Sequence, residues 1–202
     1  MAAPDRLLLA SSNAGKLAEF QAIAVENSIR VPKLEFLANF SSLPEFEENA
    51  PTIGENAAGK AAYYSRFANA PVLADDSGLV VPALGGAPGV RSARYAGPNA
   101  SDADRIQKLL GEMRGKTGEN RAAAFVCVLA VAEKGRVTAV VSDCVEGRLL
   151  EEPRGSGGFG YDPVFFVAEA GKSFAELSRD EKNRLSHRGK AFRRLLAAIG
   201  AK

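Results

Sequence analysis

The chain has 202 residues, of which 46% are hydrophobic and 25% are charged, and its formal net charge at pH 7 is +2. This composition predicts one globular domain over residues 1–202 and argues against a disordered chain. A charge so close to zero does not indicate a nucleic-acid-binding protein, because such proteins usually carry a concentrated basic face.

The N-terminal stretch MAAPDRLLLASSN lacks the basic start and long apolar run of a signal peptide, and no segment is apolar enough to cross a bilayer. We therefore expect a cytoplasmic protein without a membrane partner. Cys127 and Cys144 occur in apolar, strand-like runs and are expected to be buried, reduced thiols. Because the chain has one histidine, a closed Cys/His zinc site cannot be assembled. A catalytic metal should instead be a hard ion held by carboxylates and phosphates, which points to magnesium.

Strand and helix patterns alternate in the first half of the chain. Residues 6–10 predict a short strand that ends at the loop SSNAGK, and apolar residues from Leu17 onward recur at helical spacing. Thr52, with Glu55 three residues later, forms a capping-box pattern and predicts a helix that ends before Pro71. The apolar run VLADD directly after this helix predicts another strand.

The second half of the chain adds a β-rich region. Ser101 followed by Asp104 predicts a helix over DRIQKLLGEMRG. Two long β-rich runs joined through Lys134 and Gly135 then predict an antiparallel hairpin, and Leu149 and Leu150 are expected to start a further short segment.

Three more elements close the chain. The strand VFFV follows the loop PRGSGGFGYDP, and Ser178 with Glu181 predicts the cap of a helix. A last helix is expected to start at Ser186. Early strand-helix alternation followed by a hairpin predicts the α/β class with a mixed sheet.

The loop SSNAGK, from Ser11 to Lys16, has the composition of a phosphate-binding loop. Small residues expose backbone N–H groups, and the N-terminus of the following helix adds positive potential. It is not a Walker A loop, because Ala10 and Leu17 stand where that motif has glycine and a hydroxyl residue. The alternative is an ordinary strand-to-helix connection with a solvated Lys16.

Asp75 and Asp76 stand side by side at the end of an apolar run. Period-two alternation sends them to opposite sides of the strand, so that only one can face a given site. A carboxylate at this edge of an α/β sheet can hold magnesium or deprotonate water. We expect one aspartate to act and the other to support it, with Ser77 and Gly78 turning the chain. A plain Asp-Ser-Gly turn is the alternative.

The segment GSGGFGYDP surrounds two aromatic residues with glycines. Glycine allows the backbone to approach a ligand closely, and Phe159 or Tyr161 could stack on a flat ring such as a nucleobase. The alternative is a flexible hairpin loop whose aromatics belong to the core.

His187 and Arg188 fall in the first turn of the last predicted helix. Cations at a helix N-terminus oppose the helix dipole, which suggests that an anionic or carbonyl ligand benefits from these donors. The alternative for Arg188 is an ion pair with an acid on the surface.

Five segments in this order, SSNAGK, ENAAGKA, ADDSGLVVPALGGAPGVRSARYAG, GGFGYDPVFF and LSHRGKA, resemble the Ham1/RdgB family of inosine triphosphate pyrophosphatases. The resemblance extends from Leu7 to about Phe192. It implies an elongated mixed β-sheet flanked by helices, in two lobes with a central cleft, and a homodimer. It further implies magnesium-dependent hydrolysis of ITP, dITP and XTP to the monophosphate and pyrophosphate, which keeps deaminated bases out of DNA and RNA.

The resemblance also implies a role for particular residues. Asp76 would be the general base and a metal ligand, with Ser77 as an adjoining substrate contact. The second metal ligand would be Glu48, with Glu47 a close rival, and Lys60 would approach the phosphates. The implied phosphate-binding loop comprises Ser11, Ser12, Asn13, Ala14, Gly15 and Lys16. Implied base recognition involves Phe159, Gly160, Tyr161, Asp162, Lys182, His187 and Arg188.

One position departs from the family pattern, and two other functions stay open. The family's loop begins Thr-Gly-Asn, so Ser12 would be strained, at a cost on the order of 1 kcal/mol, if its position needs a positive φ. A nucleotide pyrophosphatase of the Maf type, which prefers pyrimidine or modified nucleotides, is the nearer alternative function. A nucleotide-binding or RNA-binding module without catalysis is the more distant one.

Overall fold

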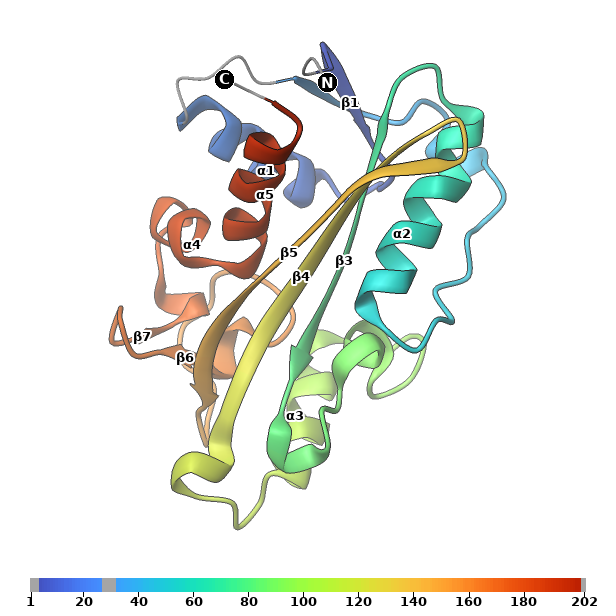
Figure 1. Ribbon diagram of the computed structural model, residues 1–202. Helices are drawn as coiled ribbons and strands as arrows, with labels where there is room; N and C mark the ends of the chain where they lie inside the picture. Colours follow the sequence, from blue (N-terminus) through green and yellow to red (C-terminus); the bar gives the residue numbers. More distant parts are fainter. Residues whose placement is uncertain (1–3, 27–31, 201–202) are drawn as a thin grey trace. The chain divides into compact units, whose positions relative to one another are not determined.

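The computed structural model describes residues 4–26 and 32–200 (Figure 1), so the ends of the predicted 1–202 domain lie outside the described residues. The described α-helices are α1 (Ala14–Glu26), α2 (Ile53–Tyr64), α3 (Asp102–Glu112), α4 (Arg179–Leu185) and α5 (His187–Ala198). The strands are β1 (Arg6–Leu9), β2 (Lys33–Phe36), β3 (Val72–Val80), β4 (Ala122–Glu133), β5 (Arg136–Leu149), β6 (Phe165–Val167) and β7 (Lys172–Ser173).

The strands form a mixed sheet. Hydrogen-bonded neighbours follow the order β2-β1-β3-β4-β5-β6-β7 among the described residues. Strand β1 is parallel to β2 and β3, whereas β6 is antiparallel to β5 and β7. The predicted α/β class with a mixed sheet and flanking helices is therefore confirmed.

The predicted hairpin between β4 and β5 is present. Its two connecting residues, Lys134 and Gly135, have φ angles of 50° and 81°. Positive φ at both positions is the geometry of a type I′ turn, whose twist matches that of the flanking strands. Leu149 is the last residue of β5, so the expectation that it opens a separate segment is wrong. Sheet pairing with β6 at Leu149 extends the strand to this point.

Local capping signals predicted helix starts correctly. The Thr52 hydroxyl accepts a hydrogen bond from the Glu55 amide at 3.1 Å, which caps α2. Reciprocal capping boxes begin α3, at Ser101 with Asp104, and α4, at Ser178 with Glu181. Each box pairs two backbone N–H groups that a helix start would otherwise leave without partners.

The chain forms two compact units. Unit 1 consists of the described residues within 1–76, 127–143 and 187–202, and unit 2 consists of residues 77–126 and 144–186. Within the described residues, none of the helices combines the length and apolar character required to span a membrane.

Strand residues of unit 1 alternate between two apolar clusters. One cluster packs against α1 and α5, which lie side by side in Figure 1, with the rings of Phe20 and Phe192 4.7 Å apart. The other cluster packs against α2 through Ala57, Ala61 and Tyr64. The alternating strand residues of the first cluster are Leu7, Leu9, Leu73, Cys127, Leu129 and Val131, and those of the second are Leu8, Val72, Ala74, Val128, Ala130 and Ala132, with Ala10 directly after β1. Helices therefore cover both faces of these strands.

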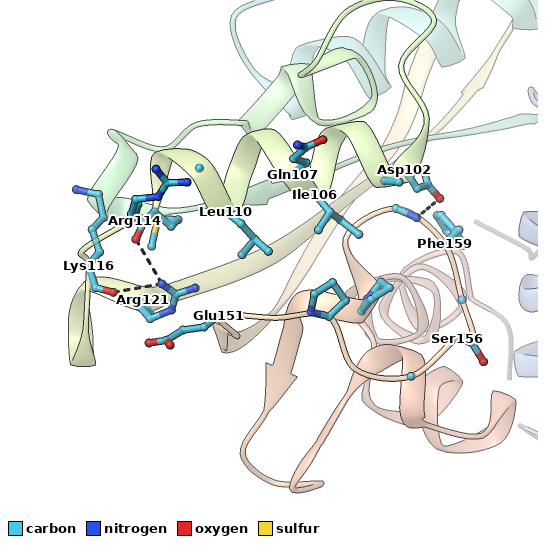
Figure 2. A pocket seen from close by; sticks show the side chains of 18 of the residues that line it. Asp102, Ile106, Gln107, Leu110, Arg114, Lys116, Arg121, Glu151, Ser156 and Phe159 are labelled. Carbon is cyan, nitrogen blue, oxygen red and sulfur yellow. Dashed lines mark hydrogen bonds between the residues drawn. The ribbon is translucent and has the colours of Figure 1, made fainter.

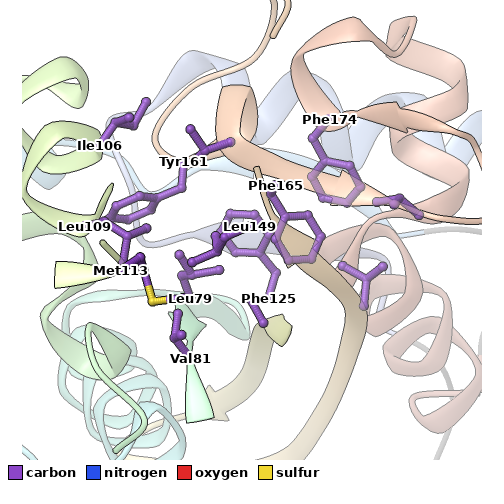
Figure 3. Close-up of a cluster of buried hydrophobic side chains, with 14 of the residues drawn as sticks. Leu79, Val81, Ile106, Leu109, Met113, Phe125, Leu149, Tyr161, Phe165 and Phe174 are labelled. Carbon is purple, nitrogen blue, oxygen red and sulfur yellow. The ribbon is translucent and has the colours of Figure 1, made fainter. Parts of the chain in front are cut away.

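Unit 2 has its own aromatic core (Figure 3). The ring of Phe165 lies 4.6 Å from that of Phe125 and 5.1 Å from that of Phe174. Leu109 and Met113 of α3 are fully buried in the same cluster.

Two expectations about β3 and the cysteines are wrong in part. Strand β3 continues through Ser77 and Gly78 to Val80, so these residues do not turn the chain.

Neither cysteine forms a disulfide, and Cys127 is buried as expected, but Cys144 is exposed because it lies on the outer side of β5.

Candidate active site

The two adjacent aspartates of β3 have different environments. Counting along the strand, Asp75 shares its parity with Leu73, which packs with α1 and α5, and Asp76 shares its parity with Ala74, which packs with α2. Asp75 is buried, whereas Asp76 is partly exposed. The predicted alternation therefore separates the buried Asp75 from the partly exposed Asp76, whose Oδ2 atom is itself buried.

Asp75 is held by cations. The Lys16 ammonium lies 2.9 Å from its carboxylate oxygens, and the Nε atom of Arg188 lies 3.6 Å away. Burial alone would raise the pKa of Asp75, but Lys16, Arg188 and Lys60 together hold that pKa well below its usual range. Asp75 is thus an ionised, enclosed carboxylate that supports neighbouring cations.

Arg188 is enclosed by acids. Its Nη1 atom donates to Glu19 at 2.8 Å, and the two side chains are 4% and 11% exposed. Burial opposes the guanidinium charge, but Glu19 and Asp75 raise the pKa of Arg188 above its ordinary value. The ion pair considered for Arg188 is present, although it is buried rather than on the surface. His187, which precedes it, is also buried.

Sequence reasoning did not find Glu19. It lies on α1, 169 residues from Arg188 in the chain, so no local pattern predicts the pair. Its position three residues after Lys16 places both side chains on neighbouring turns of one helix, and this spacing is the signal that could have suggested a shared site.

The loop from Ser11 to Lys16 is more helical than expected, because α1 begins at Ala14. The Asn13 side chain accepts a hydrogen bond from the Lys16 amide, and the Ser11 hydroxyl accepts one from the Asn13 amide, both at 3.1 Å. Ser12 does not have the positive φ that would strain it, since only Asn39 and Lys134 do so among the described non-glycine residues. The backbone conformation at position 12 therefore does not require the glycine that the family has there.

A second lysine lies among acidic groups. The Lys60 ammonium is 2.6 Å from a carboxylate oxygen of Glu48. Burial would lower the pKa of Lys60, but Asp75, Glu48 and Asp76 outweigh this effect and raise it. The exposed carboxylate of Glu47 instead accepts a hydrogen bond from Asn49 at 2.7 Å. Glu48 and Asp76 thus act on one common cationic group.

In the part of the chain that the structure describes, no three His, Cys, Asp or Glu side chains are grouped as a complete protein-only metal site. Magnesium, however, is commonly held by one or two carboxylates together with substrate phosphates. Glu48 and Asp76 supply such hard oxygen ligands, and the Lys60 ammonium shows that their surroundings stabilise a cation. The donor set therefore fits magnesium.

The predicted base-recognition segment of unit 2 is built around Asp162. This carboxylate accepts hydrogen bonds from the Phe159 amide at 2.8 Å and from the Lys182 ammonium at 2.5 Å. The ammonium also lies 4.7 Å from the centre of the Phe159 ring. Gly158 has a φ of 73°, and a Cβ there would lie 2.0 Å from the Asp162 side chain, so only glycine fits.

The two aromatics of this segment have different roles. Phe159 is 50% exposed, whereas Tyr161 is 3% exposed and its hydroxyl donates to the Ser92 carbonyl oxygen at 2.9 Å. Tyr161 is therefore a core residue, and Phe159 offers the accessible ring. Of the two rings that were expected to be able to stack on a base, Phe159 is the one that remains a candidate.

A pocket of about 920 Å³ lies beside this segment in unit 2 (Figure 2). It is lined by α3, by the segment that follows it as far as Arg121, and by residues between Glu151 and Pro163, with Asp102 and Phe159 at one end and Arg114 and Lys116 at the other. The Gly160 amide donates to Asp102 at 2.6 Å, which anchors the glycine-rich segment to the start of α3. The predicted phosphate-binding residues are not part of this pocket's lining.

Residues 7–198 match the Ham1 family. The chain belongs to the Ham1 family. It is 51% identical to a dITP/XTP pyrophosphatase of Geobacillus kaustophilus, over 94% of this chain and 91% of that protein. The structure of a HAM1 protein from Coxiella burnetii has a TM-score of 0.85 at 40% identity and covers 98% of each chain. The Ham1 protein of Staphylococcus aureus has a TM-score of 0.84 at 37% identity, over 96% of this chain and 97% of that one. The family resemblance noted in the sequence is confirmed.

Proposed function

We propose that this protein is a nucleoside triphosphate pyrophosphohydrolase that converts dITP, ITP and XTP to the monophosphate and pyrophosphate. Relatives that are about half identical over nearly the whole chain carry the name dITP/XTP pyrophosphatase. The observation that carries the proposal is the different environment of Asp75 and Asp76. Asp75 is buried and neutralised by cations, whereas Asp76 is partly exposed, with one carboxylate oxygen buried, and acts electrostatically on Lys60, the partner of Glu48.

The phosphates of the substrate are assigned to unit 1. Lys16 and Lys60 supply positive charge, and the loop from Ser11 to Lys16 supplies backbone N–H groups at the N-terminus of α1. A helix N-terminus favours anions because its first N–H groups lack helical partners. Together these groups suit a triphosphate chain. Ser77, next to Asp76 on β3, is assigned to substrate contact by the family resemblance.

Magnesium is the proposed cofactor, with Asp76 and Glu48 as its protein ligands. Glu48 is preferred to Glu47 because Glu48 contacts Lys60, whereas Glu47 is exposed and bonded to Asn49. When bound, the ion would neutralise charge on the phosphates and lower the pKa of a bound water.

Asp76 is the proposed general base. Its carboxylate accepts a proton from water while the water oxygen forms a bond to the α-phosphorus. The bond between the α-phosphorus and the oxygen that bridges to the β-phosphorus breaks, and pyrophosphate leaves with that oxygen. Lys16 and Lys60 stabilise the charge that develops on the leaving group. The overall products are the nucleoside monophosphate, pyrophosphate and one proton.

The family resemblance assigns base recognition to the Asp162 group of unit 2 and to His187 and Arg188 of unit 1. The half-exposed ring of Phe159 is the proposed stacking surface, and Lys182 and the backbone from Gly160 to Asp162 supply polar contacts. Hypoxanthine and xanthine carry an oxygen at position 6 that accepts hydrogen bonds. A protein donor that bonds to this oxygen would have no acceptor opposite the 6-amino group of adenine. Such a donor would reject ATP.

We also propose that the protein is cytoplasmic and a homodimer; the family resemblance implies the dimer. Light scattering coupled to size-exclusion chromatography measures the mass of the assembly in solution. A mass of twice 21.3 kDa supports the dimer, and a mass of 21.3 kDa contradicts it.

A substrate panel tests the proposed activity. Purified protein is incubated with ITP, XTP, dITP, GTP, ATP and a set of pyrimidine triphosphates, with magnesium or with EDTA, and pyrophosphate and orthophosphate are measured separately. We expect magnesium-dependent release of pyrophosphate from ITP, dITP and XTP. Release of orthophosphate would contradict attack at the α-phosphorus, and preference for pyrimidine or modified nucleotides would favour a function of the Maf type.

A further inference from the structure

We propose that Asp102 is a positioning residue for base recognition, because it fixes the segment that presents the ring of Phe159. This role rests on the proposed function, in which that ring stacks on the nucleobase. Asp102 is the first residue of α3 and precedes its partner, Gly160, by 58 positions in the chain. Both residues belong to unit 2.

Two successive backbone N–H groups of the glycine-rich segment are each bound by a carboxylate. The Phe159 amide donates to Asp162 at 2.8 Å, and the Gly160 amide donates to Asp102 at 2.6 Å. The glycines before and after Phe159, Gly158 and Gly160, have φ angles of 73° and 63°. Glycine allows many backbone conformations, so the two hydrogen bonds to charged acceptors select the one that is observed.

The two carboxylates hold the segment from different helices. Asp162 lies in the same turn as Phe159, and its carboxylate is joined to Lys182 of α4. Asp102 lies on α3, so its bond to Gly160 ties the turn to a second helix. Without Asp102, the turn that carries the Phe159 ring would lose its side-chain contact with α3.

Asp102 is itself fixed in place. Its Oδ1 atom pairs with the guanidinium of Arg105, which lies three residues later on α3. The Nη1 atom of Arg105 donates to the carbonyl oxygens of Ala93 and Ala100, both at 2.8 Å. The Arg105 side chain is 17% exposed. One oxygen of Asp102 is therefore oriented by Arg105, and the other is directed at Gly160, which is how a supporting residue holds a binding group in position.

This arrangement predicts an effect that depends on the base. A Phe159 ring on a loosened turn would have to be ordered when the ligand binds, and this ordering costs affinity. The cost applies only to ligands that have a base for the ring to stack on. Because Asp102 acts through the Phe159 ring, its effect should also disappear when the ring is absent.

Inorganic tripolyphosphate separates the base from the phosphates, because it has phosphates and no base. Binding of tripolyphosphate and of ITP is measured by isothermal titration calorimetry in EDTA, for the wild type, Asp102→Ala and Asp102→Asn. Asp102→Asn keeps an oxygen that can accept the Gly160 hydrogen bond but loses the charge. Asp104→Asn is the matched control, since Asp104 lies in the same first turn of α3 and accepts from the Ser101 amide instead of the glycine-rich segment.

We expect Asp102→Ala to weaken ITP binding by roughly fivefold to tenfold and Asp102→Asn to weaken it less. Tripolyphosphate binding should stay within about twofold of the wild type in both variants, because the proposed phosphate site lies in unit 1. Asp104→Asn should change either affinity by less than about twofold. In a Phe159→Ala background, Asp102→Ala should cause no further loss of ITP affinity.

Equal weakening of ITP and tripolyphosphate by Asp102→Ala would overturn the proposal. An equal loss of ITP affinity in Asp104→Asn would also overturn it, because Asp102 would then act through the stability of α3. Equal losses with and without the Phe159 ring would show that Asp102 does not act through that ring, with the same consequence. If Asp102→Ala does not fold, as judged by circular dichroism, Asp102→Asn decides by the same comparisons.

The proposed function can fail separately from this role of Asp102. A wild type that binds ITP with the expected differences among the variants, but releases no pyrophosphate, would contradict the proposed function and support the role of Asp102. Hydrolysis of ITP with unchanged ITP affinity in both Asp102 variants would overturn the role alone. A wild type that does not bind ITP would contradict both.

Discussion

The ammonium of Lys60 lies 2.6 Å from a carboxylate oxygen of Glu48, and the two side chains are 16% and 30% exposed. Asp75 and Asp76 also act on Lys60 and help to raise its pKa. Lys60 is therefore the cation of a partly enclosed acidic group. Two of these carboxylates, Glu48 and Asp76, are the proposed ligands of magnesium, so the lysine and the metal ion compete for them.

This competition predicts that Lys60→Gln binds divalent cations more tightly than the wild type in the absence of nucleotide. Removing a positive charge that contacts a proposed metal ligand, in a partly screened environment, should raise affinity by roughly threefold to tenfold. Titration with Mn²⁺, monitored by electron paramagnetic resonance, measures the effect directly. The control is Lys33→Gln, which removes the lysine of the exposed Lys33–Glu35 pair. Unchanged Mn²⁺ affinity in Lys60→Gln would show that Lys60 does not compete with the ion.

The second prediction concerns Asp76. Asp76→Asn keeps the size of the side chain but removes the proton acceptor, so turnover of ITP should fall by about 100-fold or more. Nucleotide binding should be largely retained, because Lys16 and the start of α1 are unchanged. Pyrophosphate release and ITP binding measure the two quantities, and Asp143→Asn, which removes a carboxylate of a surface ion pair, is the control. Substantial turnover in Asp76→Asn would mean that another group activates the water.

Local signals predicted the parts of the fold that depend on neighbouring residues. The capping boxes at Ser101 and Ser178 and the turn at Lys134 predicted element boundaries, because their hydrogen bonds and φ angles involve residues within a few positions. The alternation that separates Asp75 from Asp76 is likewise a property of one strand.

Tertiary contacts decided the features that sequence reasoning missed. Ser77 and Gly78 are turn-forming residues, yet they lie within β3, because pairing in the sheet overrides local preference. Strands β2 and β7 were also not predicted, because neither is an apolar run: β2 reads KLEF and β7 reads KS, whereas the equally short β1 and β6 read RLLL and FFV. The contact between Glu19 and Arg188 joins segments 169 residues apart, and only the packing of α1 beside α5 brings it about.

The third prediction concerns Phe159. If its half-exposed ring stacks on the base, Phe159→Ala should weaken ITP binding by about 1–3 kcal/mol and leave tripolyphosphate binding unchanged. Calorimetry in EDTA measures both affinities. Phe67→Ala is a suitable control because Phe67 is 47% exposed and has no assigned role at the site. Equal weakening of both ligands would indicate that Phe159 supports the fold rather than the base.

The last prediction concerns the acid sensitivity of α4, the helix that carries Lys182. The Glu181 carboxylate accepts a hydrogen bond from the Ser178 amide at 2.8 Å, and its pKa is lowered from 4.5 to about 2 by the backbone and side chain of Ser178 and by Lys172. A lowered pKa in the folded state means that the ionised carboxylate contributes stability above pH 4.5 and loses that contribution as the pH falls toward about 2.

Glu181→Gln should therefore unfold more easily than the wild type at neutral pH, and the difference in the free energy of unfolding should shrink as the pH falls below 4.5. Urea unfolding at a series of pH values measures this difference. Asp180→Asn removes the same charge from the same first turn but leaves the Ser178–Glu181 box in place, so it separates the cap from the general effect of charge near a helix N-terminus. If both variants lose stability equally with the same pH dependence, the helix dipole rather than the capping box accounts for the effect. If only Glu181→Gln loses stability with this pH dependence, the Ser178–Glu181 hydrogen bonds account for the loss of stability of this helix in acid.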